Sequence, residues 1–267
     1  MPIPMFHLAQ AAGGAGVGSD AAAMANPVAF VESAASALPG GVAGTSAPIT
    51  IILLLTLLTV APSILILCTS FTRFVVVLGL LRQAIGTQGM PPSQVIVGLS
   101  LFLTFVAMAP TLEAMWDDGL QPYLDTPVAE RDSMAAWDGM KKPLRQYMIN
   151  QIVVDGNEAS LVMMAEFSGW DPDRDGELVL DEVKLHQLVP AFVLSELKTA
   201  FLIAFRIYLP FLVIDMVVSS LLISMGMMML PPVFVSLPFK LLLFVVADGW
   251  LLVASNLMSG VQAATVG

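Results

Sequence analysis

An acidic stretch at residues 171–182 carries the clearest chemistry in the chain. Its candidate ligands are Asp171, Asp173, Asp175, Glu177 and Glu182. Acids at positions 1, 3 and 5, a glycine at position 6 and a glutamate at position 12 form the pattern of an EF-hand calcium loop, in which Glu177 at position 7 would supply its backbone carbonyl. Val179 at position 9 has no side-chain oxygen, so water or nothing fills that place. The sequence therefore predicts one calcium site, with a solvated acidic loop as the alternative.

A run of methionines lies between two long apolar segments. Its members are Met225, Met227, Met228 and Met229. Methionine side chains are unbranched and polarizable, so a cluster of them forms a soft apolar surface that adapts to whatever contacts it. Gly226 and the pair Pro231–Pro232 should end one helix and start another. The run predicts a deformable seal between two helices, with an apolar turn against lipid as the alternative.

Charged side chains interrupt the apolar segments on both sides of this run. They are Glu196, Lys198, Arg206 and Asp215 before it and Lys240 and Asp248 after it. A charge at the centre of a bilayer opposes insertion by about 2.5–3.5 kcal/mol. Glu196 and Lys198 lie two positions apart, on different sides of a helix, and cannot pair well with each other. These charges are therefore expected either to find partners in an assembly or to lie in a segment that is not a simple lipid-exposed helix.

The composition is that of a membrane protein. Of the 267 residues, 57% are hydrophobic and 12% are charged, whereas soluble domains are about 45–50% apolar and about 25% charged. The expected fold is an all-α membrane protein with four long hydrophobic helical segments and an acidic non-cytoplasmic domain between the second and the third. Cys68 is the only cysteine, so an intrachain disulfide and a cysteine-based metal site are excluded.

The apolar runs divide the chain into five expected parts. These are an Ala/Gly-rich N-terminal arm (1–46), a first hydrophobic helical pair (47–110), the acidic domain (111–188), a second hydrophobic helical pair (189–258) and a C-terminal tail (259–267). Residues 111–189 hold sixteen acidic and six basic residues, and this negative charge argues against nucleic acid as a partner. Arg73 and Arg82 lie between the first two runs without an acid, so that short loop is expected in the cytoplasm.

Several sequence blocks resemble the FliP/SctR family of type III secretion export gates. The most specific are SFTRF (70–74), GMPPSQV (89–95), SELKTAF (195–201), LPFLVID (209–215) and MGMMMLPP (225–232). The resemblance covers about residues 49–125 and 189–258 and is closest to the flagellar members. Two positions depart from the family pattern. Leu202 replaces a usual glutamine, and Arg206 replaces a usual apolar residue.

The resemblance implies a structural role in the flagellar basal body. Family members form a homopentamer in the bacterial inner membrane, surrounded by lipid, and join FliQ and FliR to make the channel for unfolded secreted flagellar proteins. By the same resemblance the four methionines form a gasket around the closed pore, Glu196 and Lys240 hold the ring between subunits, and the acidic domain faces the periplasm. No cofactor is required, and Ca²⁺ enters only through the acidic loop.

Other functions remain open from the sequence. A non-flagellar gate of the injectisome type would share the same blocks. A membrane calcium-binding protein would explain residues 171–182 but not the methionine run. A secondary transporter should show internal repeats in its two halves, and none is visible. The chain carries no GxSxG, HExxH, CxxC or phosphate-binding loop, so an enzyme is not expected.

Overall fold

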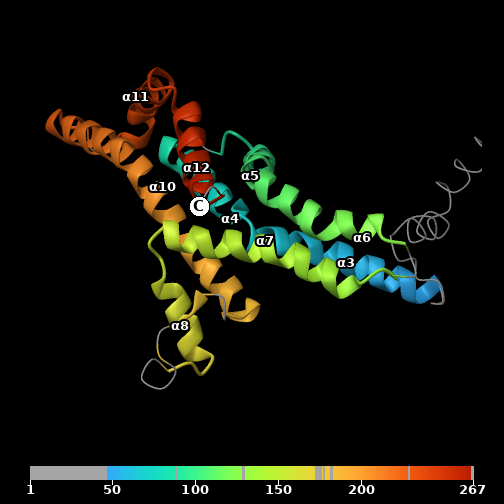
Figure 1. Ribbon diagram of the computed structural model, residues 1–267. Coiled ribbons are helices and arrows are strands. Elements are labelled where there is room, and N and C mark those ends of the chain that lie inside the picture. Colours follow the sequence, from blue (N-terminus) through green and yellow to red (C-terminus); the bar gives the residue numbers. More distant parts are fainter. Residues whose placement is uncertain are drawn as a thin grey trace, which may run out of the picture. The chain divides into compact units, whose positions relative to one another are not determined.

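The structure is a computed structural model that describes residues 47–87, 89–127, 130–171, 176, 178–180, 183–227 and 229–265. Every regular element in these ranges is a helix (Figure 1). The elements are α3 (Ala47–Cys68), α4 (Phe71–Ile85), α5 (Ser93–Met115), the π-helix η1 (Trp116–Leu120), α6 (Gln121–Asp125), α7 (Ser133–Val154), α8 (Ala159–Phe167), α10 (Leu185–Ser224), α11 (Pro232–Val246) and α12 (Gly249–Thr265). The chain divides into two units after Val60, and the ion pairs and the methionine connection described below lie in the second. The expected arm at 1–46 lies outside the described residues.

Two helical segments are long and apolar enough to cross a membrane, Ser93–Asp125 and Leu185–Ser224. The number rises to four when each of two bent helix pairs is taken as one span. Those pairs are Leu54–Cys68 with Phe71–Ile85 and Pro232–Val246 with Gly249–Val261. The expectation of an all-α membrane protein is confirmed. α10 has 40 residues and a length of about 60 Å, twice the ~30 Å of a hydrocarbon core, so only part of it can lie within a bilayer.

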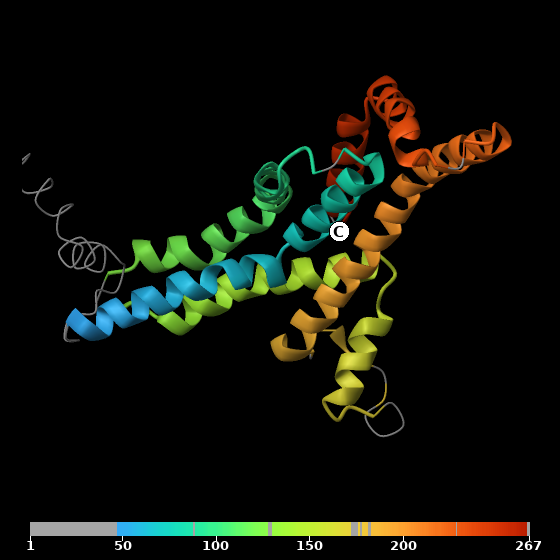
Figure 2. The ribbon, with the colours of Figure 1, turned by 180° about the vertical axis from the view of Figure 1, so that it is seen from behind.

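α4 forms the centre of the helical packing. It begins at Phe71, and its apolar face is buried against α10, which runs alongside it in both views (Figures 1 and 2). The buried residues of this face are Phe74, Val77, Leu78 and Leu81. Arg73 does not lie in a loop, as the sequence suggested, because it is in the first turn of α4 and is only 1% exposed. The cytoplasmic side of this segment stays a prediction. Arg82, in the last turn, donates to the carbonyl oxygen of Pro91 in the following loop at 3.3 Å and to the hydroxyl of Ser93, the first residue of α5, at 3.0 Å.

α7 crosses η1 at two glycines. A Cβ atom on Gly139 would lie 2.2 Å from the carbonyl oxygen of Asp118, and one on Gly119 would lie 2.7 Å from the backbone nitrogen of Met140. Both distances are too short for a real side chain, so the two backbones approach this closely only because neither position carries one. The crossing packs α7 against η1, which directly continues α5.

Candidate functional site

A buried ion pair joins α4 to α10. The guanidinium of Arg73 donates from Nε to Glu196 Oε2 at 2.9 Å and from Nη2 to Glu196 Oε1 at 2.6 Å. Arg73 also donates to Asp155, the residue that follows α7. The side chains of Arg73 and Glu196 are 1% and 0% exposed, and that of Asp155 is 11% exposed. Two-point pairing of this kind fixes both the distance and the orientation of the two groups, so it sets how the helices meet.

Neutral polar side chains extend this ion pair into a network. The Gln151 amide donates to Asp155 Oδ2 at 3.2 Å and to the Gly260 carbonyl on α12 at 3.3 Å. The Asn157 amide donates to Ser195 Oγ at 2.8 Å, next to Glu196 on α10. The network therefore ties the end of α7 to α10 and α12, with two carboxylates and one guanidinium at its centre.

Tyr147 borders the network from α7. Its ring is 5.9 Å from that of Phe192, centre to centre, in an edge-on arrangement. The hydroxyls of Tyr147 and Ser70 are both buried, and neither makes a well-formed hydrogen bond to any residue that the structure describes. Burial raises the pKa of the Tyr147 hydroxyl, and the Glu196 carboxylate raises that pKa further; the nearby Ser70 hydroxyl lowers the same pKa by less. The phenol is therefore held neutral beside the charged groups.

A second ion pair joins α10 to α11. Lys240 Nζ lies 2.7 Å from Asp215 Oδ2 and 3.2 Å from the carbonyl oxygen of Ala84, at the end of α4. The hydroxyl of Ser236, one helical turn before Lys240, donates to Asp215 Oδ1 at 2.6 Å. Lys240 is 4% exposed. Asp215 and Lys240, two of the charges that interrupt the apolar segments, thus satisfy each other.

Glu196 and Lys240 each have a partner within their own chain, which the sequence argument missed. No local pattern could have found them, because Arg73 is 123 positions from Glu196 and Asp215 is 25 positions from Lys240. A role for Glu196 and Lys240 between subunits stays a prediction. Asp215 lies nine residues after Arg206 on α10 but contacts Lys240 and Ser236 instead.

The methionine run forms the connection between α10 and α11. α10 ends at Ser224, and Gly226, two residues further on, has a φ of 77° in the left-handed region. The Gly226 N–H donates to Ile223 O at 3.0 Å and the Met227 N–H donates to Leu222 O at 2.9 Å, which together make a Schellman motif. α11 then starts at Pro232, where a missing N–H is harmless. The exposed fractions are 72% for Met225, 40% for Met227 and 98% for Met229, while Met228 lies outside the described residues.

The predicted calcium loop is described only in part. Asp171 and Gly176 are described, and Gly176 has a φ of 78°. The candidate ligands outside the described residues are Asp173, Asp175, Glu177 and Glu182. Arg145 on α7 anchors the exit of the loop by donating to Leu180 O at 2.7 Å and to Val183 O. The backbone geometry at Gly176 is the one that position 6 of a calcium loop requires.

The profile of the FliP family matches residues 54–257 of this chain. The chain belongs to the FliP family. It is 44% identical over 229 residues to the flagellar biosynthetic protein FliP of Bacillus subtilis (strain 168), a match that covers 86% of this chain and 97% of that protein. The corresponding protein of Caulobacter vibrioides is 45% identical over 243 residues, covering 91% and 87% of the two chains. That of Aquifex aeolicus is 45% identical over 219 residues, covering 80% and 86%.

The FliP-family match includes both ion pairs and the methionine run. The helices that carry them, α4, α10 and α11, all lie within residues 54–257. The resemblance drawn from the sequence blocks is confirmed at the level of the family.

Proposed function

We propose that this chain is a pore-forming subunit of the flagellar type III protein export gate, through which unfolded flagellar proteins cross the inner membrane. The family match and the name of these relatives, flagellar biosynthetic protein, support a flagellar role over an injectisome role. In this proposal the chain forms a homopentamer with FliQ and FliR in the basal body, and its acidic region faces the periplasm. The chain acts as a structural channel component and not as an enzyme.

The observation that carries the proposal is the exposed methionine connection at the tip of the α10–α11 hairpin. Exposed apolar side chains at a helix-to-helix turn have to be covered by something. Methionine can fill an irregular gap and give way when a polypeptide passes, because its side chain has three rotatable bonds and no branch. Copies of this tip arranged around an axis would close a pore against ions without blocking a moving chain.

The two ion pairs fix the helices that carry the methionine connection. Lys240 and Asp215 join the two arms of the hairpin, and Lys240 also reaches the end of α4 through Ala84. Arg73 and Glu196 hold the other end of α10 against α4. A soft seal on a rigid support can deform locally while the ring keeps its shape.

Conductance across the membrane tests the seal. Replacing Met227, Met228 and Met229 with Ala shortens the side chains that would fill the pore, so ion leakage should rise above that of the wild type while the protein level is unchanged. The control is Met216→Ala, which removes a methionine from the body of α10 whose exposed fraction (71%) lies between those of Met227 (40%) and Met229 (98%). Equal conductance in the triple variant and the wild type would show that this connection is not the seal.

We also propose that residues 171–182 bind one calcium ion per chain. The donor set of four acids and one carbonyl suits a hard cation, and the left-handed Gly176 and the anchor at Arg145 support a loop of the required shape. The role would be to order the acidic region, since the ion pairs and the methionine connection are built without this loop.

A further inference from the structure

Two carboxylates share one guanidinium nitrogen in the buried network. Nη2 of Arg73 donates to Glu196 Oε1, at 2.6 Å, and also to Asp155 Oδ2. Because one nitrogen contacts both acids, their carboxyl groups are direct neighbours. With all three groups ionised, this cluster of Arg73, Asp155 and Glu196 carries two negative charges and one positive charge. One negative charge is therefore left unbalanced in a place that is almost closed to solvent.

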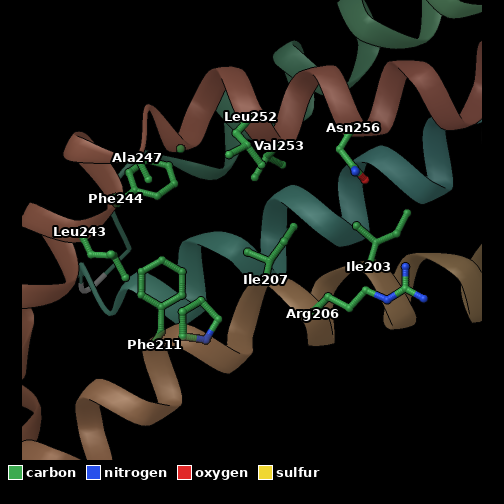
Figure 3. Close-up of a pocket in the computed structure, with 12 residues that line it drawn as sticks. Ile203, Arg206, Ile207, Phe211, Leu243, Phe244, Ala247, Leu252, Val253 and Asn256 are labelled. Atoms are coloured by element: carbon green, nitrogen blue, oxygen red, sulfur yellow. The ribbon is translucent and has the colours of Figure 1, made fainter.

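The other cations of α10 do not balance this charge. Among the residues that the structure describes, Arg73 is the only cation in hydrogen-bond or ion-pair contact with either carboxylate. Lys198, two positions after Glu196, is exposed. Arg206 lies about 15 Å further along α10 than Glu196, where it lines a separate cavity together with Asn256 of α12 (Figure 3).

The neighbouring elements supply no counter-charge either. Tyr147 on α7 borders the cluster with a neutral phenol, and Glu158 before α8 is an exposed acid. α12 contacts the network through the carbonyl oxygen of Gly260 and carries no charged residue. Arg82 on α4 and Arg145 on α7 donate to carbonyl oxygens elsewhere. The unbalanced charge thus belongs to the cluster itself.

We propose that this cluster is a proton-binding site, in which Asp155 and Glu196 together hold one proton near neutral pH. An unbalanced charge away from water is costly, and buried acids avoid it by remaining protonated. Two neighbouring carboxylates disfavour each other's ionised forms and release their protons as a pair. With one proton bound, one negative charge faces one positive charge. The inference rests on this cluster alone and does not depend on the pore proposal.

Loss of the proton should weaken the attachment of α7. Glu196 makes two hydrogen bonds with Arg73, whereas Asp155 makes one with Arg73 and one with Gln151. Asp155 is also the more exposed of the two acids, so repulsion between the carboxylates should displace it first. The end of α7 would then separate from α4 and α10. The cluster would thus make this junction sensitive to pH.

Infrared spectroscopy of the full-length chain tests the proposal, because a protonated carboxyl group absorbs separately from a carboxylate. Ordinary acids are ionised above about pH 6. We expect the wild type to keep about one protonated carboxyl group per chain at about pH 6.5 and to lose it on titration to about pH 9. Asp155→Asn and Glu196→Gln should each abolish the band, since one acid then faces one guanidinium. The control Glu158→Gln, at an exposed acid three positions after Asp155, should keep the band.

The pH dependence of unfolding by denaturant provides a second measurement. A proton that the fold holds and the unfolded chain releases raises the unfolding equilibrium constant with pH, by up to about tenfold per pH unit. This rise should begin above about pH 4, the ordinary value for acids, and end when the pair has ionised. Asp155→Asn should lack it. Tyr147→Phe should retain it, because a phenol titrates only near pH ~10 or above.

Three outcomes would overturn the proposal. The first is the absence of a protonated carboxyl group from the wild type at about pH 6.5, which needs no variant that folds. The second is a band that persists in Asp155→Asn, because the proton would then belong to another acid. The third is a wild-type stability that depends on the sodium concentration and not on pH in this range, since a bound cation would then balance the charge.

Discussion

Arg73 on α4 and Glu196 on α10 lie 123 positions apart in the sequence and form a two-point ion pair that is closed to solvent. The pair lies where α10 runs along α4, so it fixes the position of the two helices relative to each other. Asp155 adds a second carboxylate from the end of α7. One guanidinium thus joins three segments of the chain: α4, α10 and the end of α7.

Removing Glu196 should strongly destabilise the folded chain. Glu196→Ala leaves Arg73 buried with a single, partly exposed partner, and breaking a buried pair in this way costs about 3–5 kcal/mol. Thermal unfolding of the purified chain in detergent measures the loss. Lys198→Ala, an exposed position two residues away on α10, should change stability by no more than about 0.5 kcal/mol. Similar losses in the two variants would contradict the structural importance of the pair.

The Asp215–Lys240 pair should show energetic coupling between α10 and α11. A double-mutant cycle with Asp215→Asn, Lys240→Met and the double variant should give an interaction energy of about 0.5–3 kcal/mol, the range for residues in direct contact. The same cycle made with Asp215→Asn and Lys198→Met should give additive effects, because Lys198 is exposed and lies elsewhere on α10. Additivity in the first cycle would mean that the contact contributes nothing in the membrane environment.

The fold class and the sites differ in how far the sequence could predict them. Long apolar runs determine the class, because about 20 apolar residues are needed to cross a bilayer, and the end of α10 followed from Gly226 and the two prolines. The burial of α4 did not follow, because its run of eight apolar residues has the same composition whether it contacts lipid or protein.

The partners of the buried charges could not be predicted for a different reason. A helix pattern relates residues three or four apart, whereas Arg73 meets Glu196 only after the chain has passed through α5 and α7. The sequence identified Glu196 and Lys240 as costly charges that needed partners, which was sound. It assigned those partners to other subunits because tertiary contacts between distant helices leave no local pattern.

Gly226 should be hard to replace. Its φ of 77° lies in the left-handed region, where other L-residues are less stable by roughly 1–2 kcal/mol. Gly226→Ala should lower thermal stability by about that amount, and Gly226→Asn by less, since Asn tolerates this conformation. Among the described residues, apart from the chain neighbours and the helix's own backbone, no atom lies within 4 Å of a Cβ built at Gly226 or at Gly79 in the middle of α4. Gly79→Ala should therefore be neutral or stabilising, and a loss as large as that of Gly226→Ala would argue against a backbone cause.

Tyr147 should make the fold sensitive to alkaline pH. Its pKa is raised by burial above the ordinary value of about 10, so the fold retains a proton that the unfolded chain releases. The contribution of this hydroxyl to the free energy of unfolding does not change below about pH 10. Above that pH the free energy of unfolding falls, by up to about 1.4 kcal/mol per pH unit.

Tyr147→Phe should remove that part of the alkaline loss. The ring contact with Phe192 is kept, and the lost hydroxyl has no well-formed hydrogen bond, so stability at neutral pH should be unchanged or slightly higher. The measurement is thermal unfolding of both proteins from neutral pH to about pH 11. Tyr208→Phe, at a half-buried position on α10, serves as the control. Parallel pH profiles for Tyr147→Phe and the wild type would exclude this role.

Calcium binding should depend on Glu182 and leave the ion pairs unaffected. Glu182 would supply two of the oxygens at position 12, and Glu182→Gln removes the charge while keeping the size, so the heat of calcium binding by the full-length chain should disappear. The matched control is Glu166→Gln, an exposed acid on α8 before the loop, which should bind calcium as the wild type does. Because Trp170 lies beside the loop, its fluorescence should change with calcium in the wild type and in this control only. If the wild type shows no binding heat at millimolar calcium, residues 171–182 are a solvated acidic loop.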